Sequence, residues 1–112
     1  MIDFKKDNNG FVLLLGFDYI KKCPKIRLPV TREETEYMAS FFTEDFATSI
    51  GNCEQECSFG SFRLTDAPDH PFGWTDRRQR TILHYNERSW HMIVPEIVQM
   101  GKLAQRALHS NE

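Results

Sequence analysis

The hydrophobic positions at the start of the chain recur at every second residue, which is the period of a β-strand. Ile2 and Phe4 alternate with polar residues, the sequence DNNG follows, and residues 11–19 open with the apolar run FVLLL. Asn and Gly tolerate the positive φ angles of tight turns, so this segment predicts a β-hairpin. The stretch KKCPKIRLPV at residues 21–30 holds two prolines. Because proline has no N–H to donate, any strand there is predicted to be an edge strand.

From Thr31 onward the apolar positions recur at intervals of three and four, the spacing of one helical face. Thr31 and Glu34 fit a capping box, in which each residue's side chain satisfies the other's backbone N–H. Gly51 and Asn52 suit the end of a helix. The apolar stripe consists of Tyr37, Met38, Phe41, Phe42, Phe46 and Ile50. We therefore predict one amphipathic helix over residues 31–50.

The second half of the chain predicts two more strands and a second helix. Residues 58–65 alternate polar and apolar side chains, and residues 80–86 are rich in β-branched and aromatic types, both of which favour strands. A helix is expected over residues 95–109. Pro95 is either its first residue, where proline is well tolerated, or a kink inside it. Residues 90–94 accordingly fit either a short strand or the beginning of that helix.

These elements follow one another in the order ββαββα. An amphipathic helix and a one-sided sheet each need a partner to cover the apolar side. We therefore predict an α+β fold, a two-layer sandwich in which two amphipathic helices cover one face of an antiparallel sheet. The chain has 112 residues, of which 40% are hydrophobic. That size and composition fit a single domain over residues 1–112, as a monomer or a homodimer.

The chain shows no segment for membrane insertion or export. It has no run of about 18 apolar residues, the length that spans a bilayer, and its first ten residues do not resemble a signal peptide. We expect a cytoplasmic protein with no membrane partner. The three cysteines cannot form a closed disulfide framework. Cys53 and Cys57 could share a metal ion and link a dimer, but no further ligands follow at suitable spacing, so neither a metal nor a cofactor is expected.

Charge is distributed unevenly along the sequence. The formal net charge is −2, yet residues 31–60 contain seven acidic side chains and one basic one. Glu33, Glu36, Glu44 and Asp45 fall mostly outside the apolar stripe of the predicted helix and give it an acidic outer face. Complementary charge speeds association and guards specificity. We therefore predict that these four residues contact a basic protein partner.

The connection over residues 66–79 is longer than most loops in compact domains, and such loops often carry function. It contains the sequence PFGWTDRRQR. Trp and Arg are enriched at interface hot spots, so Trp74, Arg77 and Arg78 are predicted to anchor the partner. The alternative is a structural loop, in which aspartates of the loop pair with these arginines and Trp74 covers the core.

No nucleotide-binding or hydrolase motif stands in the chain: GxxxxGK[ST], GxGxxG, HExxH and GxSxG are all absent. We predict a small binding module of the inhibitor or toxin-immunity type that occludes a basic protein and has no catalytic residues. The alternative is a nucleic-acid-binding or metal-independent ribonuclease-like protein, since imidazoles titrate near neutrality and arginines bind phosphate. Its site would lie within residues 70–91 and use Arg77, Arg78, Arg80, His84 and His91.

Overall fold

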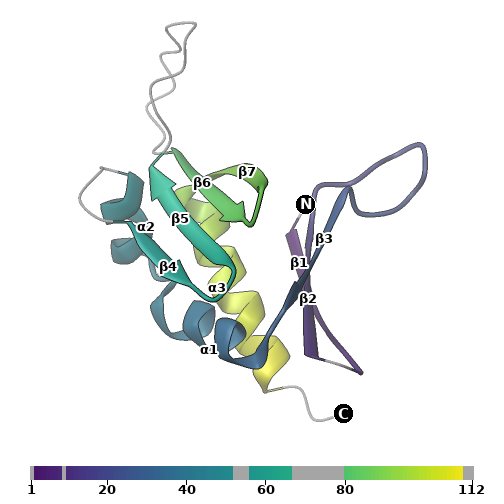
Figure 1. The fold of residues 1–112 in the computed structure, drawn as a ribbon, viewed down its shortest axis with the longest axis horizontal. Helices are drawn as coiled ribbons and strands as arrows, with labels where there is room; N and C mark the ends of the chain where they lie inside the picture. The colour runs from purple at the N-terminus through teal and green to yellow at the C-terminus, as the bar shows by residue number, and fades with distance from the viewer. Residues whose placement is uncertain (1, 9, 52–55, 67–79, 110–112) are drawn as a thin grey trace, which may run out of the picture. The chain divides into compact units, whose positions relative to one another are not determined.

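The secondary structure alternates between groups of strands and groups of helices. The computed structural model describes residues 2–8, 10–51, 56–66 and 80–109. Within these ranges the chain forms seven strands and three helices, which is the predicted α+β class (Figure 1). Two compact units are present, residues 1–42 with 99–112, and residues 43–98. The single domain predicted from the sequence stays a prediction.

The first unit contains a three-stranded antiparallel sheet. Its strands are β1 (Ile2–Asp7), β2 (Gly10–Leu15) and β3 (Ile26–Val30), in the order β1-β2-β3. Phe4 pairs with Leu13, which pairs with Leu28, so apolar side chains line one face. Residues 11–15 of the central strand are buried throughout. Pro29 lies in β3, which is an edge strand as predicted.

Two helical segments of the first unit approach each other closely. They belong to α1 (Arg32–Phe41) and to α3 (Val94–Leu108), which is part of this unit from residue 99 on. A Cβ atom at Gly101 would lie 2.6 Å from the carbonyl oxygen of Phe42, so only glycine permits this approach. One turn further on, the side-chain amide of Gln105 donates to the carbonyl oxygen of Ala39 at 2.8 Å.

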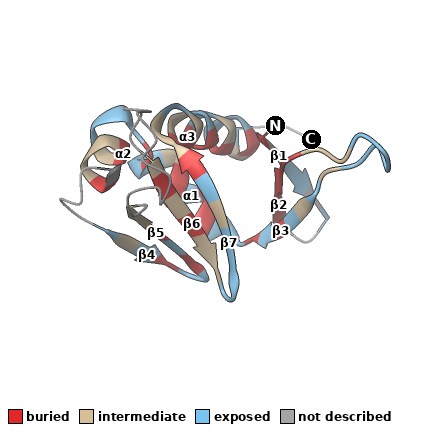
Figure 2. Cartoon of the chain, turned by 90° about the horizontal axis from the view of Figure 1, so that it is seen from above, coloured by how far each residue is buried: buried red, intermediate tan, exposed pale blue. Residues whose placement is uncertain are grey.

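The second unit contains a four-stranded antiparallel sheet. Its elements before α3 are α2 (Glu44–Gly51), β4 (Cys57–Phe59), β5 (Phe62–Asp66), β6 (Arg80–Tyr85) and β7 (Arg88–Ile93). The strand order is β4-β5-β6-β7, and α2 packs against β5 and β6. Phe62, Leu64 and Leu83 are at most 1% exposed. Buried residues alternate with more exposed ones along these strands (Figure 2), so the sheet has one apolar and one polar face.

The single helix predicted over residues 31–50 is wrong, because the structure has two helices there. The helical hydrogen bonds of α1 end with the N–H of Phe42 donating to the carbonyl oxygen of Met38 at 3.0 Å. Phe42 then leaves helical geometry, with φ −81° and ψ 71°. Thr43 begins the next helix, since its hydroxyl accepts a hydrogen bond from the N–H of Phe46 at 3.3 Å. A threonine that caps a new helix competes with continuation of the old one.

The structure also decides the two points that the C-terminal sequence left open. Residues 88–93 form β7, and α3 follows directly from Val94, so Pro95 lies in the first turn, where its missing N–H costs nothing. The side chain of Glu96 accepts a hydrogen bond from the N–H of Ile93 at 3.0 Å and helps to fix this boundary.

The strands of the described residues form two sheets where the sequence predicted one. Each named strand pairs only with strands next to it in the sequence. The single strand predicted over residues 58–65 is wrong, because a turn at Gly60 and Ser61 divides it into the hairpin of β4 and β5. Local hairpin signals also carry no information on whether two hairpins join at their edges.

Candidate functional site

The four predicted acidic contacts are exposed, but they do not share one helix. Glu33 and Glu36 lie on α1 in the first unit, whereas Glu44 and Asp45 form the first turn of α2 in the second. The acidic outer face that the sequence predicted on one helix is therefore divided between two helices. Carboxylates in a first turn also stabilise their own helix through its dipole, so part of this charge has a structural role.

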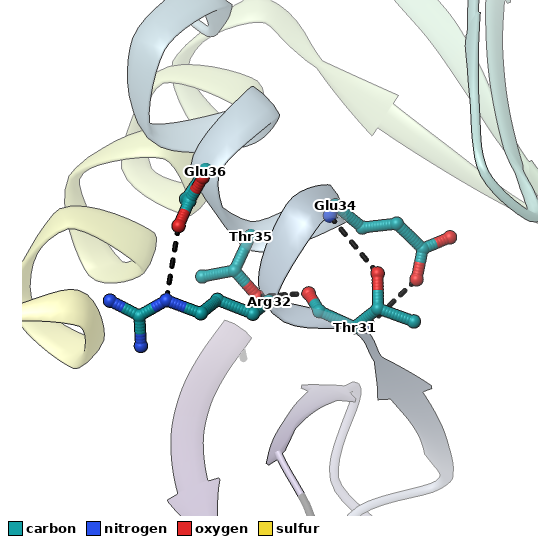
Figure 3. Close-up of polar contacts among 5 residues, drawn as sticks. All are labelled: Thr31, Arg32, Glu34, Thr35 and Glu36. Atoms are coloured by element: carbon teal, nitrogen blue, oxygen red, sulfur yellow. Dashed lines mark hydrogen bonds and ion pairs between the residues drawn. The ribbon is translucent and has the colours of Figure 1, made fainter.

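Two carboxylates of α1, Glu34 and the predicted contact Glu36, are engaged within the helix (Figure 3). Glu34 is 5% exposed and completes the predicted capping box: its Oε1 accepts from the N–H of Thr31 at 2.8 Å, and its own N–H donates to Thr31 Oγ1 at 3.1 Å. Glu36 accepts from Nε of Arg32 at 3.1 Å in an exposed pair. Exposed pairs of this kind contribute little to stability, but they reduce the charge offered to a partner.

The predicted anchors Trp74, Arg77 and Arg78 lie outside the residues that the structure describes, so their role stays a prediction. The same holds for a metal site that uses Cys53. Among the described residues, no group of three or more His, Cys, Asp or Glu side chains is placed to hold a metal ion.

The register of the second sheet gathers three cationic or titratable side chains on its polar face. Arg63 on β5 pairs directly with His84 on β6, and His84 pairs with Ser89 on β7. His91 lies two residues beyond Ser89 and is therefore the diagonal neighbour of His84 on the same face. Arg63 and His91 are exposed and His84 is half-buried. This juxtaposition of a guanidinium and two imidazoles is the candidate site.

A threonine holds the ring of His84. Its Nε2 lies 3.1 Å from Oγ1 of Thr65, and the same hydroxyl donates to the carbonyl oxygen of Asp66 at 3.2 Å. Because the Thr65 proton is committed to that carbonyl, Nε2 of His84 is assigned as the donor to Oγ1. The neutral ring then keeps Nδ1 as a hydrogen-bond acceptor.

The surroundings of His84 favour its neutral form. Partial burial is the largest cause that lowers its pKa from the ordinary value of 6.5, and the positive charges of Arg63 and His91 lower it further. The positive charge of Arg63 opposite His84 forms an arrangement that an anion would stabilise. An anion bound there would offset the repulsion and raise the pKa of His84.

The whole polar face has one sign of charge. By strand alternation and register it comprises Ser58, Arg63, Thr65, Arg80, Ile82, His84, Ser89, His91 and Ile93, a set that we call the polar sheet face. None of these strand residues is acidic, although the chain as a whole has a formal net charge of −2. The face is thus a local anion-attracting surface on an acidic protein.

Sequence reasoning named His84, His91 and Arg80 for an alternative site but missed Arg63 and Thr65. The alternation in SFRLT was the available signal, because it places both residues on the side of the strand opposite Phe62 and Leu64. Which residues lie across from them depended on register, and no sequence pattern fixed it here.

Comparisons with protein-family models, with curated proteins and with solved structures find no match for this chain. Within the described part of the chain, no helix is both long and apolar enough to cross a bilayer.

Proposed function

We propose that this protein is a small binding module that holds the phosphate groups of single-stranded nucleic acid on the polar sheet face. The observation that carries the proposal is the direct pairing of Arg63 with His84, with His91 diagonal to it, on a face whose strand residues include no carboxylate. Nucleic-acid binding was the alternative function predicted from the sequence, with its site within residues 70–91. We now place that site on the second sheet instead of the long loop.

Each residue type of the face suits a phosphate backbone. The guanidinium of Arg63 can donate two parallel hydrogen bonds to phosphate oxygens. His84 becomes a further donor when the approaching charge raises its pKa and its Nδ1 takes up a proton. The hydroxyls of Ser58 and Ser89, both exposed, add neutral donors. The half-buried side chain of Ile82 offers an apolar surface for a base.

The test is a titration of labelled single-stranded RNA with the full chain at low and moderate salt. We expect saturable binding that weakens as salt rises, because bound phosphates release counterions. Arg63→Gln should weaken binding roughly tenfold, as expected for one charge-assisted hydrogen-bonding group. Arg88→Gln is the matched control, since Arg88 is exposed in the same sheet but pairs with Tyr85 and belongs to the other face. Equal losses in both variants, or no saturable binding, would contradict the proposal.

The same samples separate binding from cleavage. Two imidazoles beside an arginine are the groups that metal-independent ribonucleases need for proton transfer and charge stabilisation. RNA recovered after the titration is examined on a denaturing gel. Intact RNA supports a binding module, whereas cleavage that disappears in His84→Ala would assign an enzymatic function to the same residues.

A second candidate function is capture of a basic protein, the inhibitor or immunity-type role predicted from the sequence. Its support is that Glu33, Glu44 and Asp45 are exposed and form no ion pair within the described residues. Trp74, Arg77 and Arg78 remain its proposed anchors. For the fold, a two-layer sandwich remains the proposed arrangement of helices and sheet. The test is a quantitative pull-down from the native host: Glu44→Gln with Asp45→Asn should release a basic partner that Arg63→Gln retains.

A further inference from the structure

The connection between β2 and β3 carries the two most exposed large hydrophobic side chains among the described residues. It runs over residues 16–25 and extends from the ends of both strands (Figure 1). Tyr19 is 82% exposed and Ile20 is 93% exposed. Lys21, Lys22 and Lys25 are exposed beside them. We call Tyr19, Ile20, Lys21, Lys22 and Lys25 the hairpin tip.

The hairpin tip is held by its own hydrogen bonds. Asp18 and Cys23 form an antiparallel bridge, with the N–H of Asp18 donating to the carbonyl oxygen of Cys23 at 2.8 Å. The carboxylate of Asp18 also accepts from the N–H groups of Ile20 and Lys21, at 2.9 and 3.0 Å. The ring of Phe17 packs edge-on against Tyr19 with their centroids 4.9 Å apart. Tyr19 and Ile20 are therefore presented by an ordered turn.

These hydrogen bonds lower the cost of moving the hairpin tip out of water. A backbone N–H moved out of water without a partner costs several kcal/mol, and here the donors of Ile20 and Lys21 already have one. Tyrosine is enriched at the boundary between water and lipid, and lysine keeps its ammonium group among the headgroups while its stem contacts apolar surface. The combination suits the interfacial region of a bilayer.

The charge of the tip selects the kind of lipid. Residues 16–25 contain three lysines and one carboxylate, that of Asp18. This carboxylate accepts hydrogen bonds from two backbone N–H groups. Each lysine near an anionic leaflet raises the affinity about fivefold. Two apolar side chains bury far less area than the roughly 800 Å² per partner of a standard protein interface. Membrane binding requires no such area, because each inserted apolar group contributes to the affinity separately.

We propose that the hairpin tip docks this protein on anionic lipid surfaces, with Tyr19 and Ile20 entering the interface and the lysines binding acidic headgroups. The sequence predicted no membrane partner because no segment can span a bilayer, but surface docking requires no span. The proposal is independent of nucleic-acid binding, since the tip belongs to the first unit and the polar sheet face to the second.

The test is co-sedimentation of the full chain with vesicles. We expect binding to vesicles of phosphatidylcholine with phosphatidylserine and little binding to phosphatidylcholine alone. Lys21→Gln with Lys25→Gln should lower the partition coefficient about thirtyfold, the equivalent of two lysine contacts. Ile20→Asp should also reduce binding at least tenfold, because it removes an inserted apolar group and adds like charge. All three positions are exposed, so these variants should fold.

Matched controls come from the same unit. Lys5→Gln with Lys6→Gln removes the same charge from exposed positions of β1, and Phe41→Ser removes an apolar side chain that is 51% exposed on α1. Both should bind as the parent chain does. Losses equal to those of the tip variants, equal binding to neutral vesicles, or no binding to either would overturn the proposal. Polyglutamate serves as a further probe: binding to it through the tip, without vesicle binding, would assign the tip to an acidic protein instead.

Discussion

At the scale of single residues, the chemistry of this protein depends on what lies across a strand. The sequence named His84 and His91 for an alternative site, but it did not indicate which residues lie opposite them in the sheet. The register places Arg63 opposite His84, and this single pairing makes the imidazole sensitive to charge. Burial is the largest cause of the lowered pKa of His84, and its charged neighbours across the sheet lower that pKa further.

The first prediction concerns the titration of His84. Arg63→Gln should raise the pKa of His84 toward its ordinary value of 6.5, because one of the positive charges that disfavour the imidazolium is removed. The change is measured by NMR titration of the imidazole resonances. Arg88→Gln, which removes an arginine from the opposite face, should leave the titration unchanged. A parent His84 that titrates at or above 6.5 would show that the neighbours do not act in this way.

The same pKa sets the direction of a pH effect on stability. The unfolded chain protonates His84 near 6.5 while the folded chain resists protonation, so the unfolded state binds more protons in this range. The stability that His84 contributes is therefore present above 6.5 and lost as the pH falls through and below that value. Thermal unfolding across this range should show His84→Gln losing less stability on acidification than the parent chain. A parallel decline in both proteins would rule out this contribution.

At the scale of elements, the capping box shows that the start of a helix can be predicted from residues close together in the sequence. Thr31 and Glu34 were predicted as a reciprocal pair, and both hydrogen bonds are present. The apolar stripe was also predicted, but it did not reveal the break at Phe42, since a threonine at position 43 is compatible with helix continuation and with a new cap. The stripe marks which side is buried, and the end of a helix depends on competing hydrogen bonds that the stripe does not describe.

The contact between α1 and α3 within the first unit can be tested by substitution of Gly101. Gly101→Ala places a Cβ atom 2.6 Å from the carbonyl oxygen of Phe42, and backbone cannot yield as a side chain can. The helices must separate, which should cost about 1–3 kcal/mol and outweigh the gain of about 1 kcal/mol in helix propensity. Urea unfolding measures the difference. Lys102→Ala, at an exposed neighbouring position, should be within about 0.5 kcal/mol of the parent.

At the scale of the whole molecule, the first unit is assembled from both ends of the chain. Residues 99–112 belong with residues 1–42, while residues 43–98 are continuous. The boundary between units falls inside α3, so a helix that reads as one amphipathic element contributes to two units. Nothing in the periodicity of residues 95–109 marks this boundary.

The division into two units predicts a local effect of truncation. A chain that stops after Val98 lacks the buried residues Met100 and Ala104 and the hydrogen bond from Gln105 to Ala39. Amides of α1 should then exchange with solvent faster, while amides of β6 in the second unit keep their protection. Hydrogen exchange with mass spectrometry measures both segments in one experiment. Equal loss of protection in α1 and β6 would instead support the single cooperative domain predicted from the sequence.

The sequence by itself determined the first hairpin, the strand over residues 80–86, the C-terminal helix to within one residue at each end, the capping box, the edge position of Pro29 and the α+β class. Each of these depends on residues within a few positions of one another, because backbone conformation and amphipathic faces are local properties. Tertiary structure decided the separation into two sheets, the contact at Gly101 and the meeting of Arg63 with His84 and His91. These features depend on strand register and on close packing between segments that are distant in the sequence. Differences of a few ångströms decide whether such contacts form, and a local sequence pattern carries no information about those distances.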